Sequence, residues 1–165
     1  MIIIVKNKDT LLIDDFIFKC SIGKKGFCNE KVEGDLTTPK GIFNLGNIYY
    51  RSDRVQKPFS KLKSISIKKN MGWCDDPNSK FYNKLIKIKK NLKISHEKLY
   101  RKDHKYDFFI LIKYNYKNPI KLKGSAIFLH LTKNYLPTKG CIALCEKDFL
   151  ILAKLINKKT KIKIN

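Results

Sequence analysis

The chain has 165 residues, of which 43% are hydrophobic, and its formal net charge at pH 7 is +22. This length suits a single domain with its own core, and no segment lacks large apolar residues, which excludes an extended disordered region. The lysines run evenly from Lys6 to Lys163 and no nucleic-acid-binding module is recognisable, so the charge indicates a solvated lysine surface and no nucleic-acid partner.

The N-terminal sequence carries an apolar run of only four residues, Ile2 to Val5, without a basic lead or a small-residue cleavage site. It does not resemble a secretory signal. No stretch approaches the roughly 20 apolar residues of a membrane-spanning helix. We therefore expect no membrane span, and we expect a monomer.

Short runs rich in β-branched and aromatic residues alternate with turn signals along the chain, which predicts a mainly β protein. Residues 23–39, rich in glycine, threonine and charge, are expected to form an ordered loop. Strands are expected over Ile2–Val5, Leu11–Ile13, Phe16–Cys20, Gly41–Leu45, Phe108–Tyr114, Ala126–Leu131 and Lys161–Ile164.

One segment has helical periodicity. Glu146–Asn157 places apolar residues three and four positions apart, with acidic residues in its first turn and lysines just beyond its end, as the helix dipole favours. The pattern predicts one domain over residues 1–165, built mainly of strands with one or two short helices.

The cysteines and histidines show no metal-binding pattern. The five cysteines are odd in number and form no CxxC pair, and the three histidines lack the spacing of metal ligands. We expect free thiols, no metal and no cofactor.

The candidate chemistry lies near the C-terminus, where an apolar strand ends in His130 and a loop leads to Gly140-Cys141. A strand can hold an imidazole rigidly at a sheet edge, and glycine allows close approach of the backbone. A nearby imidazole lowers the pKa of a thiol and later protonates a leaving amine, so the pair can perform acyl transfer. The spacing alone also fits, and by itself favours, a buried apolar cysteine and a hydrogen-bonded structural histidine.

The motifs of the chain resemble the L,D-transpeptidase (YkuD-like) catalytic domain family, and more closely its small stand-alone bacterial branch. The similarity runs from about Gly23 to the C-terminus, and its most specific part is Gly124–Leu144. Further motifs follow in the order of that branch: Glu33-Gly-Asp-Leu-Thr-Thr-Pro-Lys-Gly41, Tyr50-Arg-Ser-Asp-Arg54, Gly72-Trp-Cys-Asp-Asp-Pro77 with Tyr82-Asn83, and Arg101 with Tyr106-Asp107.

The resemblance implies a β-sandwich-like catalytic domain that remodels bacterial peptidoglycan. In such enzymes the cysteine, here Cys141, attacks a stem-peptide carbonyl next to diaminopimelate, forms a thioester acyl-enzyme and passes the acyl group to an acceptor amine. His130 would act as base and then as acid. The backbone at Thr138, Lys139 and Gly140 would position the cysteine and supply oxyanion donors. A cell-envelope location follows from the family, whereas the lack of a visible signal peptide leaves the cytoplasm open.

The sequence departs from the better-known branch at two positions. Leu131 follows the histidine where glycine is usual, and Ala143 stands where an arginine often follows the Gly-Cys pair. A different arginine must then bind the substrate carboxylate, because only a guanidinium offers a rigid planar fork. Arg54 and Arg101, which both lie within the branch motifs, are the candidates.

Trp73 and Tyr82 are candidates for an apolar wall along the stem peptide, although a lone tryptophan also suits the core. Two other functions stay open. The same cysteine site would act as a hydrolase (carboxypeptidase, endopeptidase or amidase) if water replaced the amine, and a non-catalytic basic module would bind anionic wall polymer.

Overall fold

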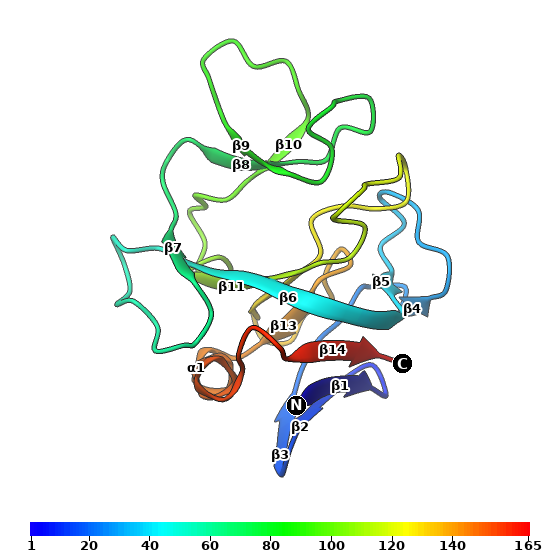
Figure 1. Cartoon of the computed structure of the whole chain (residues 1–165), viewed down its shortest axis with the longest axis vertical. Helices are drawn as coiled ribbons and strands as arrows, with labels where there is room; N and C mark the ends of the chain where they lie inside the picture. The colour runs from blue at the N-terminus through cyan, green and yellow to red at the C-terminus, as the bar shows by residue number, and fades with distance from the viewer.

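A computed structural model describes all 165 residues, which form strands and a single helix, α1 (Glu146–Leu155) (Figure 1). The strands are β1 (Ile2–Lys6), β2 (Thr10–Ile13), β3 (Phe16–Lys19), β4 (Phe27–Cys28), β5 (Thr38–Pro39), β6 (Gly41–Tyr50), β7 (Ser64–Ser66), β8 (Met71–Cys74), β9 (Leu85–Lys87), β10 (His96–Lys98), β11 (Phe108–Ile112), β12 (Phe128–Leu131), β13 (Ile142–Leu144) and β14 (Lys161–Ile164).

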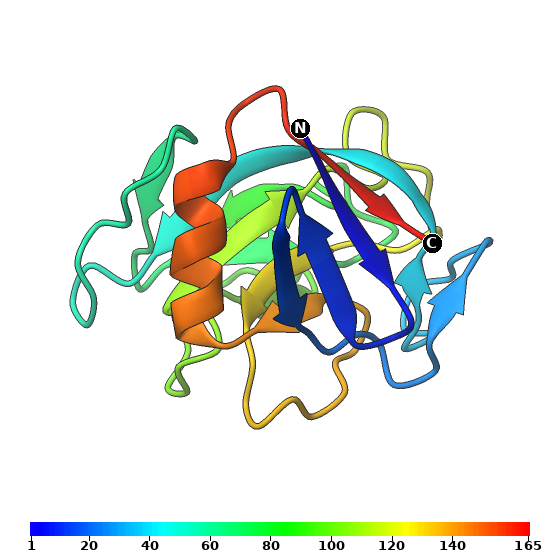
Figure 2. The same cartoon turned by 90° about the horizontal axis from the view of Figure 1, so that it is seen from below.

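Nine strands form the main sheet, in the order β13-β12-β11-β6-β14-β1-β2-β3 with β7 added beside β6. The long strand β6 joins its two halves. Residues 41–44 of β6 pair with β14, whereas residues 45–50 pair with β11. Figure 2 shows β6 curving past both α1 and the β1–β3 strands, so the sheet wraps around a core instead of lying flat.

The larger core has 24 buried residues and lies on one face of the sheet. Strand alternation sends Phe108 and Ile110 of β11 to this face, where Phe108 stacks on Phe149 of α1 with ring centroids 5.8 Å apart. The helix ends at Leu155 because Ile156 is extended, with ψ of 157°. This packing fixes α1 and, just before it, β13.

A second core of 10 buried residues lies on the opposite face. Phe109 and Phe128 project there and meet Trp73 of the small sheet β10-β8-β9, with the Trp73 and Phe128 ring centroids 5.2 Å apart. Cys141 belongs to this core and is 9% exposed. The candidate nucleophile therefore lies where the main sheet meets the small one.

The mainly β class predicted from the sequence is confirmed. The helix ends two residues earlier than predicted, and the strand predicted over residues 41–45 continues to Tyr50. Sequence patterns missed β7 to β10, which are only three or four residues long. The 23–39 segment is mostly loop, and within it the two-residue strands β4 and β5 pair with each other. No helix has the length and apolar character needed to cross a membrane.

Candidate active site

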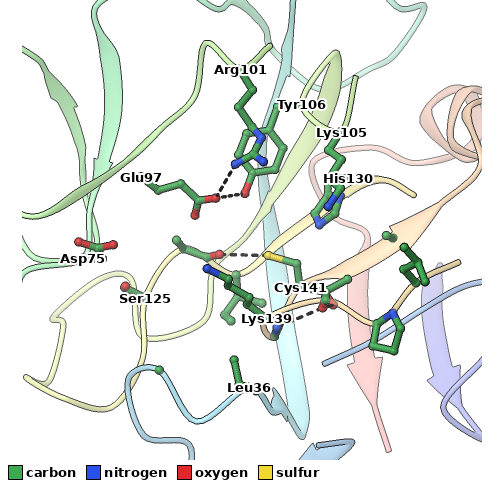
Figure 3. A pocket seen from close by; sticks show the side chains of 18 of the residues that line it. Leu36, Asp75, Glu97, Arg101, Lys105, Tyr106, Ser125, His130, Lys139 and Cys141 are labelled. Atoms are coloured by element: carbon green, nitrogen blue, oxygen red, sulfur yellow. Dashed lines mark hydrogen bonds and ion pairs between the residues drawn. The ribbon is translucent and has the colours of Figure 1, made fainter. Parts of the chain in front are cut away.

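The Cys141 thiol is held against strand β12. The Phe128 amide donates a hydrogen bond to the Cys141 sulfur at 3.3 Å, and the thiol donates to the Ala126 carbonyl oxygen at 3.2 Å. Strands β12 and β13 run parallel, and side chains two residues apart on a strand share a face. His130 therefore lies on the same face as Phe128 and the thiol, and Figure 3 shows His130 and Cys141 lining one cleft.

The His130 ring is buried, with 6% of the residue exposed, and has a fixed orientation. Its Nδ1 lies 2.7 Å from the Leu131 carbonyl oxygen. A carbonyl oxygen only accepts hydrogen bonds, so Nδ1 carries the proton and Nε2 is left as the basic nitrogen. The Tyr106 ring meets the imidazole edge-on, with centroids 5.4 Å apart, and restrains its rotation.

Burial keeps both members of the pair neutral. It raises the pKa of Cys141 to about 12, with a further contribution from the Glu97 carboxylate, and it lowers the pKa of His130 to about 4. The sequence led us to expect an imidazole that lowers the pKa of the thiol. That expectation was wrong for the resting site, because a neutral imidazole carries no charge to stabilise a thiolate. If the sulfur attacks a carbonyl, its proton has to be transferred to a base during the attack, and the neutral His130 imidazole is the base that also lines the cleft.

The buried imidazole makes stability depend on pH. Between pH 6.5 and about pH 4 the unfolded chain holds a proton at His130 that the folded chain does not, so the free energy of unfolding falls as pH falls. We expect His130 to account for a loss of up to about 3 kcal/mol over this range. The free energy of unfolding, measured with urea at several pH values, should fall less with decreasing pH in His130→Gln than in wild type. Parallel curves would contradict the assignment of a neutral buried imidazole.

The backbone around Cys141 is held by two threonine hydroxyls. Thr138 Oγ1 donates to the Cys141 carbonyl oxygen at 2.6 Å and accepts from the Gly140 amide at 3.1 Å. Thr38 Oγ1 donates to the Gly140 carbonyl oxygen at 2.9 Å. The Gly140 amide is thus occupied, whereas the Lys139 and Cys141 amides donate to no protein acceptor. These two amides are the ones available to an oxyanion.

The cleft around the pair has a volume of about 690 Å³ and is lined by both acidic and basic side chains, among them the buried Lys31. Its partly buried acids are Glu33, Asp75 and Glu97, and the last two lie on one side of Cys141 (Figure 3). The basic residues that line it include Lys98, Arg101, Lys105, Lys133 and Lys139.

The comparison with known families gives one result. The model of the YkuD family, the L,D-transpeptidase catalytic domain, matches residues 1–164. The chain belongs to this family. The resemblance seen in the sequence is thereby confirmed for essentially the whole chain. No curated protein and no solved structure gives a significant match. The YkuD family comprises cysteine-dependent L,D-transpeptidases that act on peptidoglycan.

The structure places the two candidate arginines of this L,D-transpeptidase domain differently. Arg101 lines the cleft and is held by Asp103 through contacts of 2.9 and 2.6 Å, with Glu97 at 3.7 Å. Arg54 does not line it. Its guanidinium binds Asp107 at 3.1 Å and the carbonyl oxygens of Lys102 and Asp103 at 2.9 and 3.1 Å, so it fixes the 102–107 loop from outside.

Neither Trp73 nor Tyr82 lines the cleft of the YkuD domain. Trp73 is fully buried, and its Nε1 donates to Asn83 at 2.8 Å. Tyr82 is 4% exposed, and its hydroxyl donates to Glu33, which does line the cleft. Both aromatic residues support the cleft from behind instead of forming its wall.

Sequence reasoning missed Glu97 as a site residue of the YkuD domain. Its Oε1 accepts a hydrogen bond from the Tyr106 hydroxyl at 2.5 Å, and Tyr106 in turn packs on His130. One signal was available: Glu97 is the only acidic residue between Asp76 and Asp103, in a segment rich in lysine. An isolated acid in such a segment indicates a position where a negative charge is needed.

Proposed function

We propose that the protein is a peptidoglycan L,D-transpeptidase that uses Cys141 as nucleophile and His130 as general base. The observation that supports this most strongly is the placement of a thiol and an oriented imidazole on one face of adjacent strands, within one cleft. The family supplies the substrate class, and the chain supplies a thiol and an imidazole that line one cleft.

In the first half-reaction the Cys141 thiol gives its proton to His130 Nε2 while the sulfur attacks a stem-peptide carbonyl next to diaminopimelate. The resulting oxyanion accepts hydrogen bonds from the Cys141 and Lys139 amides. His130 then returns the proton to the leaving amine, and a thioester remains on Cys141.

In the second half-reaction an acceptor amine attacks the thioester carbonyl. His130 takes one proton from this amine and gives it back to the Cys141 sulfur, so the thiol is restored and a new amide bond joins two stems. The substrate lies in the bacterial cell wall, so we also propose the cell envelope as the working compartment.

The basic residues that line the cleft suit the carboxylates of stem peptides. Arg101 is the arginine that lines it, so Arg101→Lys is expected to raise KM for a muropeptide several-fold with a smaller change in kcat. Arg54→Lys is the matched control, because Arg54 lies outside the cleft and acts on it only through the 102–107 loop, so KM should change less than in Arg101→Lys. Steady-state kinetics of the two variants check this prediction. An increase in KM confined to Arg54→Lys would reverse the assignment.

The proposed reaction is tested with purified protein and diaminopimelate-containing muropeptides, with products identified by mass spectrometry. New cross-linked dimers that Cys141→Ala does not form would support the transpeptidase. Shortened stems without dimers would indicate the hydrolase instead. Unchanged muropeptides together with no adduct on Cys141 would indicate a module that only binds wall polymer.

A further inference from the structure

A group of three polar residues on one side of the cleft has no part in the mechanism above. Asp75, Glu97 and Ser125 all line the cleft, and Figure 3 shows them on the same side of Cys141. Glu97 pairs with Trp73 across strands β10 and β8, and Asp75 is two residues beyond Trp73. The two acids are therefore diagonal neighbours on one sheet face, at a typical separation of roughly 7 Å.

Two of these side chains bury polar atoms without partners. Ser125 is 6% exposed, and its Oγ makes no hydrogen bond of normal length, because the nearby Tyr82 hydroxyl donates its proton to Glu33 instead. Asp75 Oδ1 is likewise buried without a hydrogen bond, and Asp75 forms no ion pair. An unsatisfied buried polar atom is costly, and native proteins keep few of them away from functional sites. Both residues line the same cleft, so a ligand bound there can approach them.

The charge of this group is unusual for the protein. Two carboxylates stand close together in a chain with a net charge of +22. Burial raises the pKa of Glu97, and the charge of Asp75 raises it further, whereas Tyr106, Arg101 and Lys139 oppose the shift. The only ion pair of Glu97 is with Arg101, whose Nη1 lies 3.7 Å from the carboxylate. The same guanidinium also binds Asp103 through Nη2. Part of the negative charge is left for a ligand.

We propose that Asp75, Glu97 and Ser125 form a subsite that binds a primary ammonium group beside the nucleophile. An ammonium has three N–H donors and no acceptor, which matches two carboxylates and one hydroxyl oxygen. Its positive charge pairs with the acids, whereas a neutral or anionic group would leave them uncompensated. The role of this subsite in catalysis, binding an amine of the stem peptide, rests on the function proposed above.

Alkylthiolation of Cys141 tests the subsite without requiring turnover. Two methanethiosulfonate reagents of similar size are used, one ending in a 2-aminoethyl group and the other in a 2-hydroxyethyl group. In each case the sulfur of Cys141 forms a disulfide with the reagent, and methanesulfinate leaves. Peptide mapping by mass spectrometry gives the rate at Cys141 alone, and the ratio of the two rates cancels any change in thiol reactivity.

Asp75→Asn is expected to lower the ammonium-to-hydroxyl rate ratio about fivefold, the effect of one unit charge at about 4 Å screened as in water. Ser125→Ala should lower it by a smaller factor. Asp15→Asn removes the same charge from an exposed position far along the chain and should leave the ratio unchanged. Equal ratios in wild type and Asp75→Asn would overturn the subsite. A Cys141 that reacts with neither reagent would contradict the proposed function instead.

Amide NMR decides the subsite independently of thiol reactivity. Titration with ethylammonium is expected to shift the amide resonances of residues 75 and 125 in wild type but not in Asp75→Asn. Ethanol should shift these resonances in neither protein. No shift with ethylammonium would overturn the proposal.

With muropeptides, the same Asp75→Asn variant distinguishes the two sources of the amine. Slower formation of the acyl-enzyme would place the donor ammonium in the subsite. A lower ratio of transfer to hydrolysis, with unchanged acylation, would place the acceptor amine there.

Discussion

Replacing His130 by glutamine is expected to slow acylation of Cys141 by roughly a thousandfold or more. Burial raises the pKa of this thiol to about 12, so almost none of it is thiolate at neutral pH, and the sulfur depends on His130 to accept its proton. The protein is mixed with a carbapenem or a muropeptide, the reaction is quenched after short times, and mass spectrometry gives the rate at which the acylated protein forms.

His104→Gln is the matched control for this experiment. His104 is exposed, and its Nε2 lies 2.9 Å from the Thr132 carbonyl oxygen, away from the thiol. Its replacement should leave acylation close to the wild-type rate. The residual rate of His130→Gln should rise with pH, because hydroxide must then remove the thiol proton. A His130→Gln protein that is folded and acylated within tenfold of wild type would remove His130 from the mechanism.

Gly140→Ala is expected to reduce activity at least about a hundredfold, because it displaces the backbone that presents the nucleophile. Gly140 has a φ of +142°, and a Cβ at this position would lie 2.8 Å from the Thr37 carbonyl oxygen. This neighbour is backbone, held within a loop that Lys31 binds through a 2.8 Å hydrogen bond to the same oxygen. The turn must therefore shift, and the Cys141 amide moves with it.

Gly26→Ala separates this displacement from simple backbone strain. Gly26 also has a positive φ, +81°, but an added Cβ would meet only the flexible end of Lys8, at 3.5 Å. The Gly26→Ala variant should lose about 1 kcal/mol of unfolding free energy and keep its activity. Acylation rates and urea unfolding of both variants check the contrast. Equal losses of activity in the two variants would show that strain, and not the clash, is responsible.

The sequence predicted the β class and one helix because these depend on local patterns. The β-branched run Ile2–Val5, the alternation in Lys161–Ile164 and the helical spacing after Cys145 can all be read from the order of apolar residues. The three-residue strands β9 and β10 carry too few residues for such a pattern, and their pairing with β8 depends on tertiary contacts. Local propensity could not reveal them.

The site was only partly predictable, for a similar reason. Motif order pointed to Cys141 and His130, and the structure places both in one cleft. The order of the motifs did not show that Arg54 would bind a loop while Arg101 lines the cleft, since the two arginines look equivalent in the sequence. Burial is the main cause of the pKa shifts of Cys141 and His130, and burial is a property of the whole fold.

The central claim is that Cys141 forms a covalent acyl-enzyme with a peptidoglycan stem. Intact-protein mass spectrometry after rapid mixing with a diaminopimelate-containing tetrapeptide, followed by peptide mapping, tests it most directly. The account predicts one acyl group, attached to Cys141, that is absent from Cys141→Ala and retained in Cys145→Ala. No adduct under conditions where the peptide is consumed, or an adduct on another residue that Cys141→Ala keeps, would contradict it.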